Sequence, residues 1–223
     1  MKRRKKAQPT TAATPALPRV GLVTLGCSKN TVDSEVLLAK LDQSGFGLAT
    51  KAEDADVLIV NSCGFIDAAK QESIDAMLEA AKLKEQGVKA VVAVGCLIQR
   101  YKQELTKEIP EVDLMLGFSG LHHLVPELAQ RGLIEDPVTT HPGVRQFLGQ
   151  HPHVRYLKIS EGCDHTCAFC AIPLMRGKHR SEPLTRLIQE AQQLEQQGAK
   201  EINLVAQDLG HWGRDLGLGG PKL

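Results

Sequence analysis

Aromatic residues are scarce in this sequence. They make up 4% of the 223 residues, with one Trp and two Tyr, so aliphatic side chains must form most of the core. No stretch approaches the roughly 20 consecutive apolar residues that a membrane-spanning helix needs, and the N-terminal residues hold no apolar signal-peptide core. The net charge of +1 provides no strongly basic nucleic-acid-binding surface. These absences predict a cytoplasmic protein that crosses no membrane.

The charge is unevenly distributed along the chain. Lys and Arg occupy positions 2–6, and Thr, Ala and Pro dominate from there to residue 18. Such a segment cannot bury enough apolar area to fold, so a disordered basic tail is expected over residues 1–18. The tail could contact RNA through its charges, but a solvated tail is the favoured interpretation.

The first half of the chain alternates short aliphatic runs with amphipathic stretches. Continuous apolar strands that alternate with helices are typical of a parallel sheet covered on both faces, so an α/β domain is expected over residues 19–130. The predicted strands are 20–25, 57–60, 90–94 and 112–116, and the predicted helices are 31–43, 66–86, 98–109 and 121–130.

Three cysteines, Cys27, Cys63 and Cys96, each stand just past the carboxyl end of one of these strands, next to a glycine. The carboxyl ends of parallel strands share one edge, where ligands bind, so the three thiols should meet in space. Each alone could be a small buried hydrophobe, but three at one structural offset favour a shared metal site. Thiols also stay reduced in the cytosol. Because there are three thiolates and not four, an iron–sulfur cluster with one open iron is the natural inference.

A second triplet, Cys163, Cys167 and Cys170, follows a predicted strand over 153–160 at Cys-x-x-x-Cys-x-x-Cys spacing. Three thiolates on one loop can again hold an iron–sulfur cluster and leave one iron open. The alternative is a structural zinc site in which His165 completes a Cys₃His set. Zinc motifs usually come as two Cys-x-x-Cys pairs, and no second pair lies nearby, so iron–sulfur is favoured.

The C-terminal third shows only the beginning of another α/β domain. Residues 131–152 are rich in Pro, His and Gly and are expected to be a linker with a strand at 144–148. A strand, the Cys loop, a helix over 184–197 and a strand over 201–205 then predict the opening βαβ unit of a barrel or a doubly wound sheet over 153–223. One and a half units cannot close a barrel of about eight. The chain is therefore expected to be a fragment whose helix leaves Leu187, Ile188 and Leu194 uncovered.

Four longer motifs carry a resemblance to a known family. They are LGCSKNTVDSE at 25–35, NSCGFIDAAKQES at 61–73, GCLIQRY at 95–101 and EGCDHTCAFCAIPLMRG at 161–177. Together they resemble the methylthiotransferases of the radical S-adenosylmethionine (SAM) superfamily, over residues 19–208. Members of that family join an N-terminal three-Cys domain, a radical SAM barrel and a small RNA-binding-type TRAM domain; the rest of the barrel and TRAM are missing here.

The resemblance implies a fold, two cofactors and a chemistry. The fold is a flavodoxin-like parallel-sheet domain followed by the start of a radical SAM (βα) barrel. Two 4Fe–4S clusters are implied, one on Cys163, Cys167 and Cys170 that binds and cleaves SAM, and one on the N-terminal three cysteines. The product of SAM cleavage in that family is a 5′-deoxyadenosyl radical, which abstracts hydrogen from an unreactive C–H bond; the protein supplies position and shielding.

The motifs also imply a substrate and partners. One branch of the family modifies a tRNA adenosine, and another modifies the β-carbon of an aspartate in a small-subunit ribosomal protein. Ser28 and Lys29 stand where the tRNA branch usually has Gln-Met, so the ribosomal branch is favoured. The alternatives are tRNA modification or a non-catalytic iron–sulfur or zinc protein. An electron donor such as flavodoxin or ferredoxin is implied, RNA contact would fall to the missing TRAM domain, and the chain alone is expected to be inactive.

No catalytic residue beyond the cluster ligands is assigned from the sequence. The charged side chains of Lys29, Asp33 and Glu35 are interpreted as a polar loop and a capped helix start. Two stretches depart from the family pattern: Glu182 stands where Arg is usual in Ser-Arg-Pro, and residues 209–212 (LGHW) replace a stretch that usually carries Thr or Ser and a Tyr.

Overall fold

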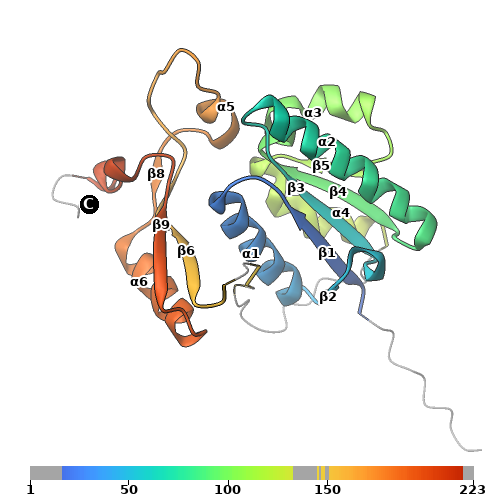
Figure 1. Cartoon of the computed structure of the whole chain (residues 1–223), viewed down its shortest axis with the longest axis horizontal. Coiled ribbons are helices and arrows are strands. Elements are labelled where there is room, and N and C mark those ends of the chain that lie inside the picture. Colours follow the sequence, from blue (N-terminus) through green and yellow to red (C-terminus); the bar gives the residue numbers. More distant parts are fainter. Residues whose placement is uncertain (1–16, 133–144, 146, 149–150, 218–223) are drawn as a thin grey trace, which may run out of the picture.

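The computed structural model describes residues 17–132, 145, 147–148 and 151–217. Residues 1–16 of the tail expected at 1–18, and most of the linker expected at 131–152, lie outside the described residues. Two units stand side by side in Figure 1, an N-terminal unit (residues 19–130) and a C-terminal unit (residues 151–217). No helix within the described ranges is long and apolar enough to cross a membrane.

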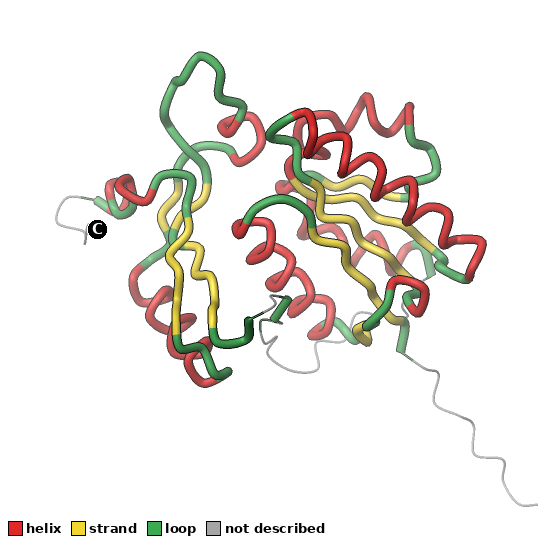
Figure 2. Tube along the Cα trace, in the orientation of Figure 1, coloured by secondary structure: helices red, strands yellow, loops and turns green. Residues whose placement is uncertain are grey.

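The N-terminal unit is a five-stranded parallel sheet between helices (Figure 2). The strand order is β2-β1-β3-β4-β5, the flavodoxin-like order expected from the sequence. Every residue of β3 and β4 is buried, which explains why these strands are continuous apolar runs. The strands are β1 Arg19–Thr24, β2 Gly47–Leu48, β3 Val57–Ser62, β4 Ala90–Gly95 and β5 Leu114–Leu116.

Alternate residues of the central strands face two separate cores. Leu58 and Val60 of β3 pack with α2 and α3 on one face, whereas Val57 and Ile59 pack with α1 and α4 on the other. The helices are α1 Ser28–Gln43, α2 Asp67–Lys82, α3 Cys96–Glu108 and α4 Leu124–Gln130, with 3₁₀ turns η1 Ala52–Asp54, η2 Leu83–Gln86 and η3 Phe118–His123. The predicted helices are thus present, and α1 and α3 begin earlier than predicted, directly after or at a cysteine.

The C-terminal unit contains the predicted parallel βαβ element. Strands β6 Val154–Lys158 and β9 Glu201–Val205 pair in parallel, and α6 Leu184–Gln196 connects them. The strand predicted over 153–160 ends early, because Ser160–Glu161 forms a separate strand β7 that pairs with β8 Arg180–Ser181. The remaining elements are α5 Ile172–Arg176, η4 Leu209–His211 and η5 Arg214–Leu216.

Two expectations for this half of the chain are corrected. The α6 face is covered, because Leu187 and Leu194 are buried and Leu187 belongs to one core cluster with Trp212. Of the three residues expected to be uncovered, only Ile188 is exposed. The strand expected at 144–148 falls partly outside the described residues, and Arg145, Phe147 and Leu148 form no strand.

The two units meet along α1 and α3. The β6 strand packs against α1, and α5 packs against α3. Figure 1 shows α5 reaching from the C-terminal unit toward the end of the N-terminal sheet where β3 and β4 finish. That edge carries the three N-terminal cysteines.

Candidate functional site

Cys27, Cys63 and Cys96 line one cavity of about 360 Å³ at the carboxyl edge of the N-terminal sheet. Cys27 immediately precedes α1, Cys63 follows β3, and Cys96 is the first residue of α3. The juxtaposition predicted from the strand ends is therefore present in the structure. The opposite wall comes from the C-terminal unit, through Ile172, Met175, Arg176 and Gln207.

Glycines allow the backbone to pass close to these cysteines. Gly26 has φ +87°, and a Cβ at this position would lie 2.8 Å from Cys63 Cβ and 3.0 Å from Cys63 Sγ. A Cβ on Gly64 would lie 2.8 Å from the Cα of Leu97. A side chain on Gly26 would collide with Cys63 in the cavity wall, and one on Gly64 would collide with the backbone at the start of α3, so both positions require glycine.

Buried hydrogen bonds hold the cysteine loops in place. The Asn30 side chain is fully buried, and its Nδ2 donates to the carbonyls of Leu25 at 2.9 Å and Ser62 at 3.1 Å. The Ser73 hydroxyl accepts the Cys63 N–H at 2.9 Å and lies 3.0 Å from the Cys63 carbonyl. The loops after β1 and β3 are thereby fixed to each other and to α2 before any ligand binds.

The thiol of Cys96 is buried and close to both a polar group and a cation. Its Sγ lies 3.8 Å from Asn30 Oδ1. Burial raises the pKa of the Cys96 thiol, and the positive charge of Arg176 opposes this rise. Because the thiolate is the form that ligates a metal, the nearby guanidinium favours the form that a cluster needs.

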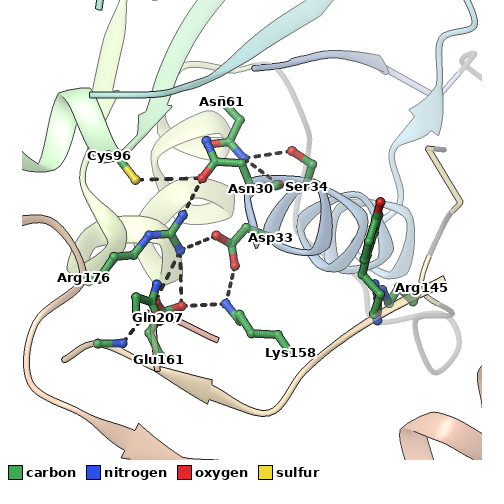
Figure 3. A network of polar contacts seen from close by, with 12 residues as sticks. Asn30, Asp33, Ser34, Asn61, Cys96, Arg145, Lys158, Glu161, Arg176 and Gln207 are labelled. Atoms are coloured by element: carbon green, nitrogen blue, oxygen red, sulfur yellow. Dashed lines mark hydrogen bonds and ion pairs between the residues drawn. The ribbon is translucent and has the colours of Figure 1, made fainter. Parts of the chain in front are cut away.

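Arg176 of α5 connects the two units at this cavity (Figure 3). Its side chain is 3% exposed. It donates to Asp33 Oδ2 at 2.5 Å, to Glu161 Oε2 at 3.2 Å and to Asn30 Oδ1. Asp33 and Asn30 belong to α1, so one guanidinium bridges helix α1, strand β7 and the wall of the cysteine cavity.

Lys158 completes this buried ion network. Its Nζ donates to Asp33 and to Glu161 Oε2, the latter at 2.7 Å. Burial disfavours the charged amine, but the carboxylates of Asp33 and Glu161 outweigh burial and raise the pKa of Lys158. They also hold the pKa of Arg176 above its ordinary range. Two cations therefore balance two carboxylates at the unit interface.

A second buried ion pair ties the segment between the units to α1. Arg145 donates to Glu35 Oε2 at 2.6 Å, to Glu190 Oε1 at 2.7 Å and to the Tyr156 carbonyl at 2.5 Å. Glu35 also accepts the Leu148 N–H at 3.2 Å. Asp33 and Glu35, which were interpreted from the sequence as part of a polar helix start, thus contact residues that lie more than 100 positions later in the chain.

The second cysteine triplet lies on a more open loop between β7 and α5. Cys167 is exposed, Cys163 and Cys170 are half-buried, and Phe169 is 95% exposed. The loop is anchored at its start, where the Cys163 N–H donates to the Gly177 carbonyl at 3.1 Å. Two residues after Cys170 the chain enters α5, whose side chains form the wall of the first cavity.

The spacing of the thiols bears on which metal centre they suit. One tetrahedral zinc with Zn–S bonds of about 2.3 Å holds its sulfur ligands roughly 3.8 Å apart. Within the described part of the chain, the potential metal-ligand atoms of His165, Asp208 and His211 lie within 4.8 Å of one another. The three Sγ atoms of neither cysteine triplet lie that close together. A single tetrahedral zinc ion would therefore need the thiols of either triplet to lie closer together than they do in this structure.

His165 points away from a Cys₃His arrangement. Its Nε2 lies 2.8 Å from Asp208 Oδ2, beyond the end of β9, and its ring packs edge-on against His211. The hydrogen bond from His165 lowers the pKa of Asp208. The zinc alternative for the second triplet is therefore not the arrangement seen in the structure.

Sequence reasoning missed Asn30, Lys158, Glu161 and Arg176 as site residues. Asn30, Glu161 and Arg176 lie inside the first and fourth motifs. Their place within these motifs is the sequence feature that could have marked them as site residues. Their roles depend on contacts between α1 and residues that follow it by 125 to 146 positions in the sequence. No local sequence pattern predicts such contacts.

Comparison with known proteins places these features in a family context. The family described as "Uncharacterized protein family UPF0004" matches residues 19–117. The chain is 46% identical over 205 residues to the ribosomal protein uS12 methylthiotransferase RimO of Sulfurihydrogenibium sp., covering 92% of this chain and 46% of the relative. The protein of the same name from Myxococcus xanthus is 50% identical over 208 residues, covering 91% of this chain and 44% of the relative.

A solved structure supports the fold. The cobalamin-dependent S-adenosylmethionine radical enzyme OxsB matches with a TM-score of 0.56 at 11% identity, over 87% of this chain and 34% of that protein. The present chain spans less than half the length of the curated relatives it matches. The comparisons with the curated relatives confirm the resemblance to methylthiotransferases that the cysteine motifs indicate.

Proposed function

We propose that this chain is part of a radical SAM methylthiotransferase that adds a methylthio group to the β-carbon of an aspartate in ribosomal protein uS12. The observation that carries the proposal is the shared cavity: three cysteines from separate strand ends face α5, which begins two residues after Cys170. The substrate assignment is supported by the identity to relatives named for this activity and by Ser28 and Lys29 in the first motif.

The residues fit two 4Fe–4S clusters. Cys27, Cys63 and Cys96 would hold one in the first cavity, where Cys63 and Cys96 are buried and Cys27 is exposed. The open loop of Cys163, Cys167 and Cys170 would hold the other, where SAM would bind. Three ligands at each site leave one iron free for a small molecule. When bound, the cofactors would supply the radical that an unactivated carbon requires.

The chain's own side chains would shield and orient this chemistry. Phe65, Ile66, Ile172 and Met175 give the first cavity an apolar lining, although Phe65 and Ile66 are themselves exposed at its rim. Asn30 fixes the loops that carry the ligands. The ion network of Asp33, Lys158, Glu161 and Arg176 holds the two units against each other.

Further parts of the proposal concern the domain boundaries, the location in the cell and the partners. We propose the unit boundaries 19–130 and 153–223, a cytoplasmic location, and a small electron donor such as flavodoxin or ferredoxin. RNA contact would belong to a TRAM-type domain outside these 223 residues.

Mass spectrometry of uS12 tests the proposal. The gene that encodes this chain is deleted in its source organism, and uS12 is compared with that of the parent strain. The expected result is an aspartate that carries a methylthio group in the parent and loses it on deletion. Unchanged uS12 together with loss of a methylthiolated tRNA adenosine would assign the chain to the tRNA branch and contradict the proposal.

A further inference from the structure

The cavity of the three N-terminal cysteines is lined by cations but by no carboxylate among the described residues. Its charged lining side chains are Lys29 and Arg176. Lys29 belongs to the N-terminal unit, whereas Arg176 is supplied by the C-terminal unit. The positive side of the cavity is therefore complete only when the two units are in contact.

The orientation of Arg176 is fixed by partners that lie behind it. Asp33 and Glu161 line a neighbouring cavity together with Arg176 and do not line the cysteine cavity. The guanidinium thus stands between the two carboxylates and the thiols. The Phe118 ring lies 4.2 Å from its Cζ, so the cation is held between an aromatic face, two carboxylates and the Asn30 amide.

A fixed cation next to a negatively charged cluster changes the reduction potential of that cluster. The potential of an iron–sulfur cluster depends on its net charge, on hydrogen bonds and on solvent exposure. Reduction adds a negative charge, which a nearby buried cation stabilises because screening by water is weak there. The geometry places Arg176 next to one of the thiols: Cys96 Sγ lies 3.8 Å from Asn30 Oδ1, the oxygen that accepts a hydrogen bond from Arg176.

We propose that Arg176 sets the reduction potential of the cluster at Cys27, Cys63 and Cys96, and that this cluster is tuned only when the C-terminal unit is docked. Asp33 and Glu161 are positioning residues that hold the guanidinium against the cavity. The inference rests on the proposed cluster at these three cysteines and adds a role for a residue of the other unit.

The test uses the whole chain with Cys163, Cys167 and Cys170 changed to Ala, so that only the N-terminal cluster forms. The Arg176→Met, Arg176→Lys and Asp33→Asn variants are reconstituted anaerobically in this background, and iron content is measured first. Redox titration followed by electron paramagnetic resonance then gives the potential of each variant. Arg186→Met is the matched control, since Arg186 is an exposed arginine of the same unit, paired with Glu182.

At a fixed potential, Arg176→Met should lower the ratio of reduced to oxidised cluster at least tenfold. For a one-electron couple this corresponds to a reduction potential that is lower by about 59 mV. Arg176→Lys should retain most of the potential, because it keeps the charge. Asp33→Asn keeps a side-chain oxygen that can accept the hydrogen bond from Arg176 but removes the negative charge behind the guanidinium, so the potential of this variant should be unchanged or higher. Arg186→Met should match the parent.

The signs of the shifts separate tuning from simple loss of docking. A residue that only held the units together would give equal shifts in the same direction for Arg176→Met and Asp33→Asn, and this result would overturn the inference. An unchanged reduction potential in an Arg176→Met variant that binds its full iron would also overturn the inference. That result would leave the proposed function intact. If Arg176→Met loses its iron, the test of the inference is the reduction potential of the Asp33→Asn variant. A reduction potential below that of the parent background would contradict the proposal. No iron in the parent background would overturn both proposals.

Discussion

The guanidinium of Arg176 lies 2.5 Å from the carboxylate of Asp33, a residue 143 positions earlier in the chain. This contact joins the helix that follows Cys170 to the helix that follows Cys27. Both cysteine triplets are thus connected to one buried ion network.

Gly26→Ala should impair the first metal site more than a glycine change elsewhere. Gly26 and Gly45 both have φ +87°, but a Cβ on Gly26 would lie 2.8 Å from Cys63 Cβ, whereas a Cβ on Gly45 meets nothing within 4 Å. Each variant should lose about 1–3 kcal/mol of unfolding free energy from backbone strain. Only Gly26→Ala should also lose iron at the N-terminal site. Equal iron retention in both variants would show that the cavity tolerates the added methyl group.

Arg145→Ala should destabilise the chain strongly. The Arg145 and Glu35 side chains are 7% and 3% exposed, and removal of one partner of a buried pair costs about 3–5 kcal/mol. The loss should appear in urea unfolding, together with faster proteolysis within residues 131–152. Arg186→Ala is the control, because the Arg186 side chain is 67% exposed in its pair with Glu182 and its loss should give no resolvable change. Equal stability of the two variants would contradict this prediction.

Asp56 should give the N-terminal unit an acid-dependent contribution to stability. Its carboxylate accepts the Arg19 N–H at 2.7 Å and pairs with Lys89 at 2.8 Å. Burial alone would raise its pKa, but Lys89 and the Arg19 N–H outweigh burial and lower the pKa of Asp56.

A lowered pKa in the folded state stabilises the fold above the unfolded value of about 3.9, and the stabilisation is lost as the pH falls through the folded value. Asp56→Asn should therefore be less stable than the parent by roughly 1 kcal/mol near pH 7, and the difference should shrink below about pH 4. Urea unfolding from pH 7 to pH 3 measures this. A difference that stays constant over that range would exclude the assigned role.

The sequence predicts the N-terminal sheet well because its signals are local. Runs such as 57–60 are apolar throughout, since both faces of β3 are buried, and a cysteine follows each central strand. The two-residue strand β2 at Gly47–Leu48 is too short to give such a pattern. Likewise, β7 and β8 are two residues each, so a single longer strand was predicted in place of β7.

Contacts between distant segments could not be predicted. The interface charges depend on which helix faces which strand, and a lone Arg176 or Asp33 carries no periodic signal. The uncovered face expected on α6 was wrong for a related reason. Trp212, in a stretch that departs from the family pattern, belongs to one core cluster with Leu187, and its Nε1–H donates to the Glu182 carbonyl at 3.0 Å.

The central claim is that each cysteine triplet holds its own iron–sulfur cluster. Iron is counted after anaerobic reconstitution in three forms of the chain: the parent, the form with Cys27, Cys63 and Cys96 changed to Ala, and the form with Cys163, Cys167 and Cys170 changed to Ala. The account predicts about eight irons in the parent and about four in each variant, with an electron paramagnetic resonance signal from each remaining cluster. Stoichiometric zinc without iron, or a variant of one triplet that loses all the iron, would contradict it.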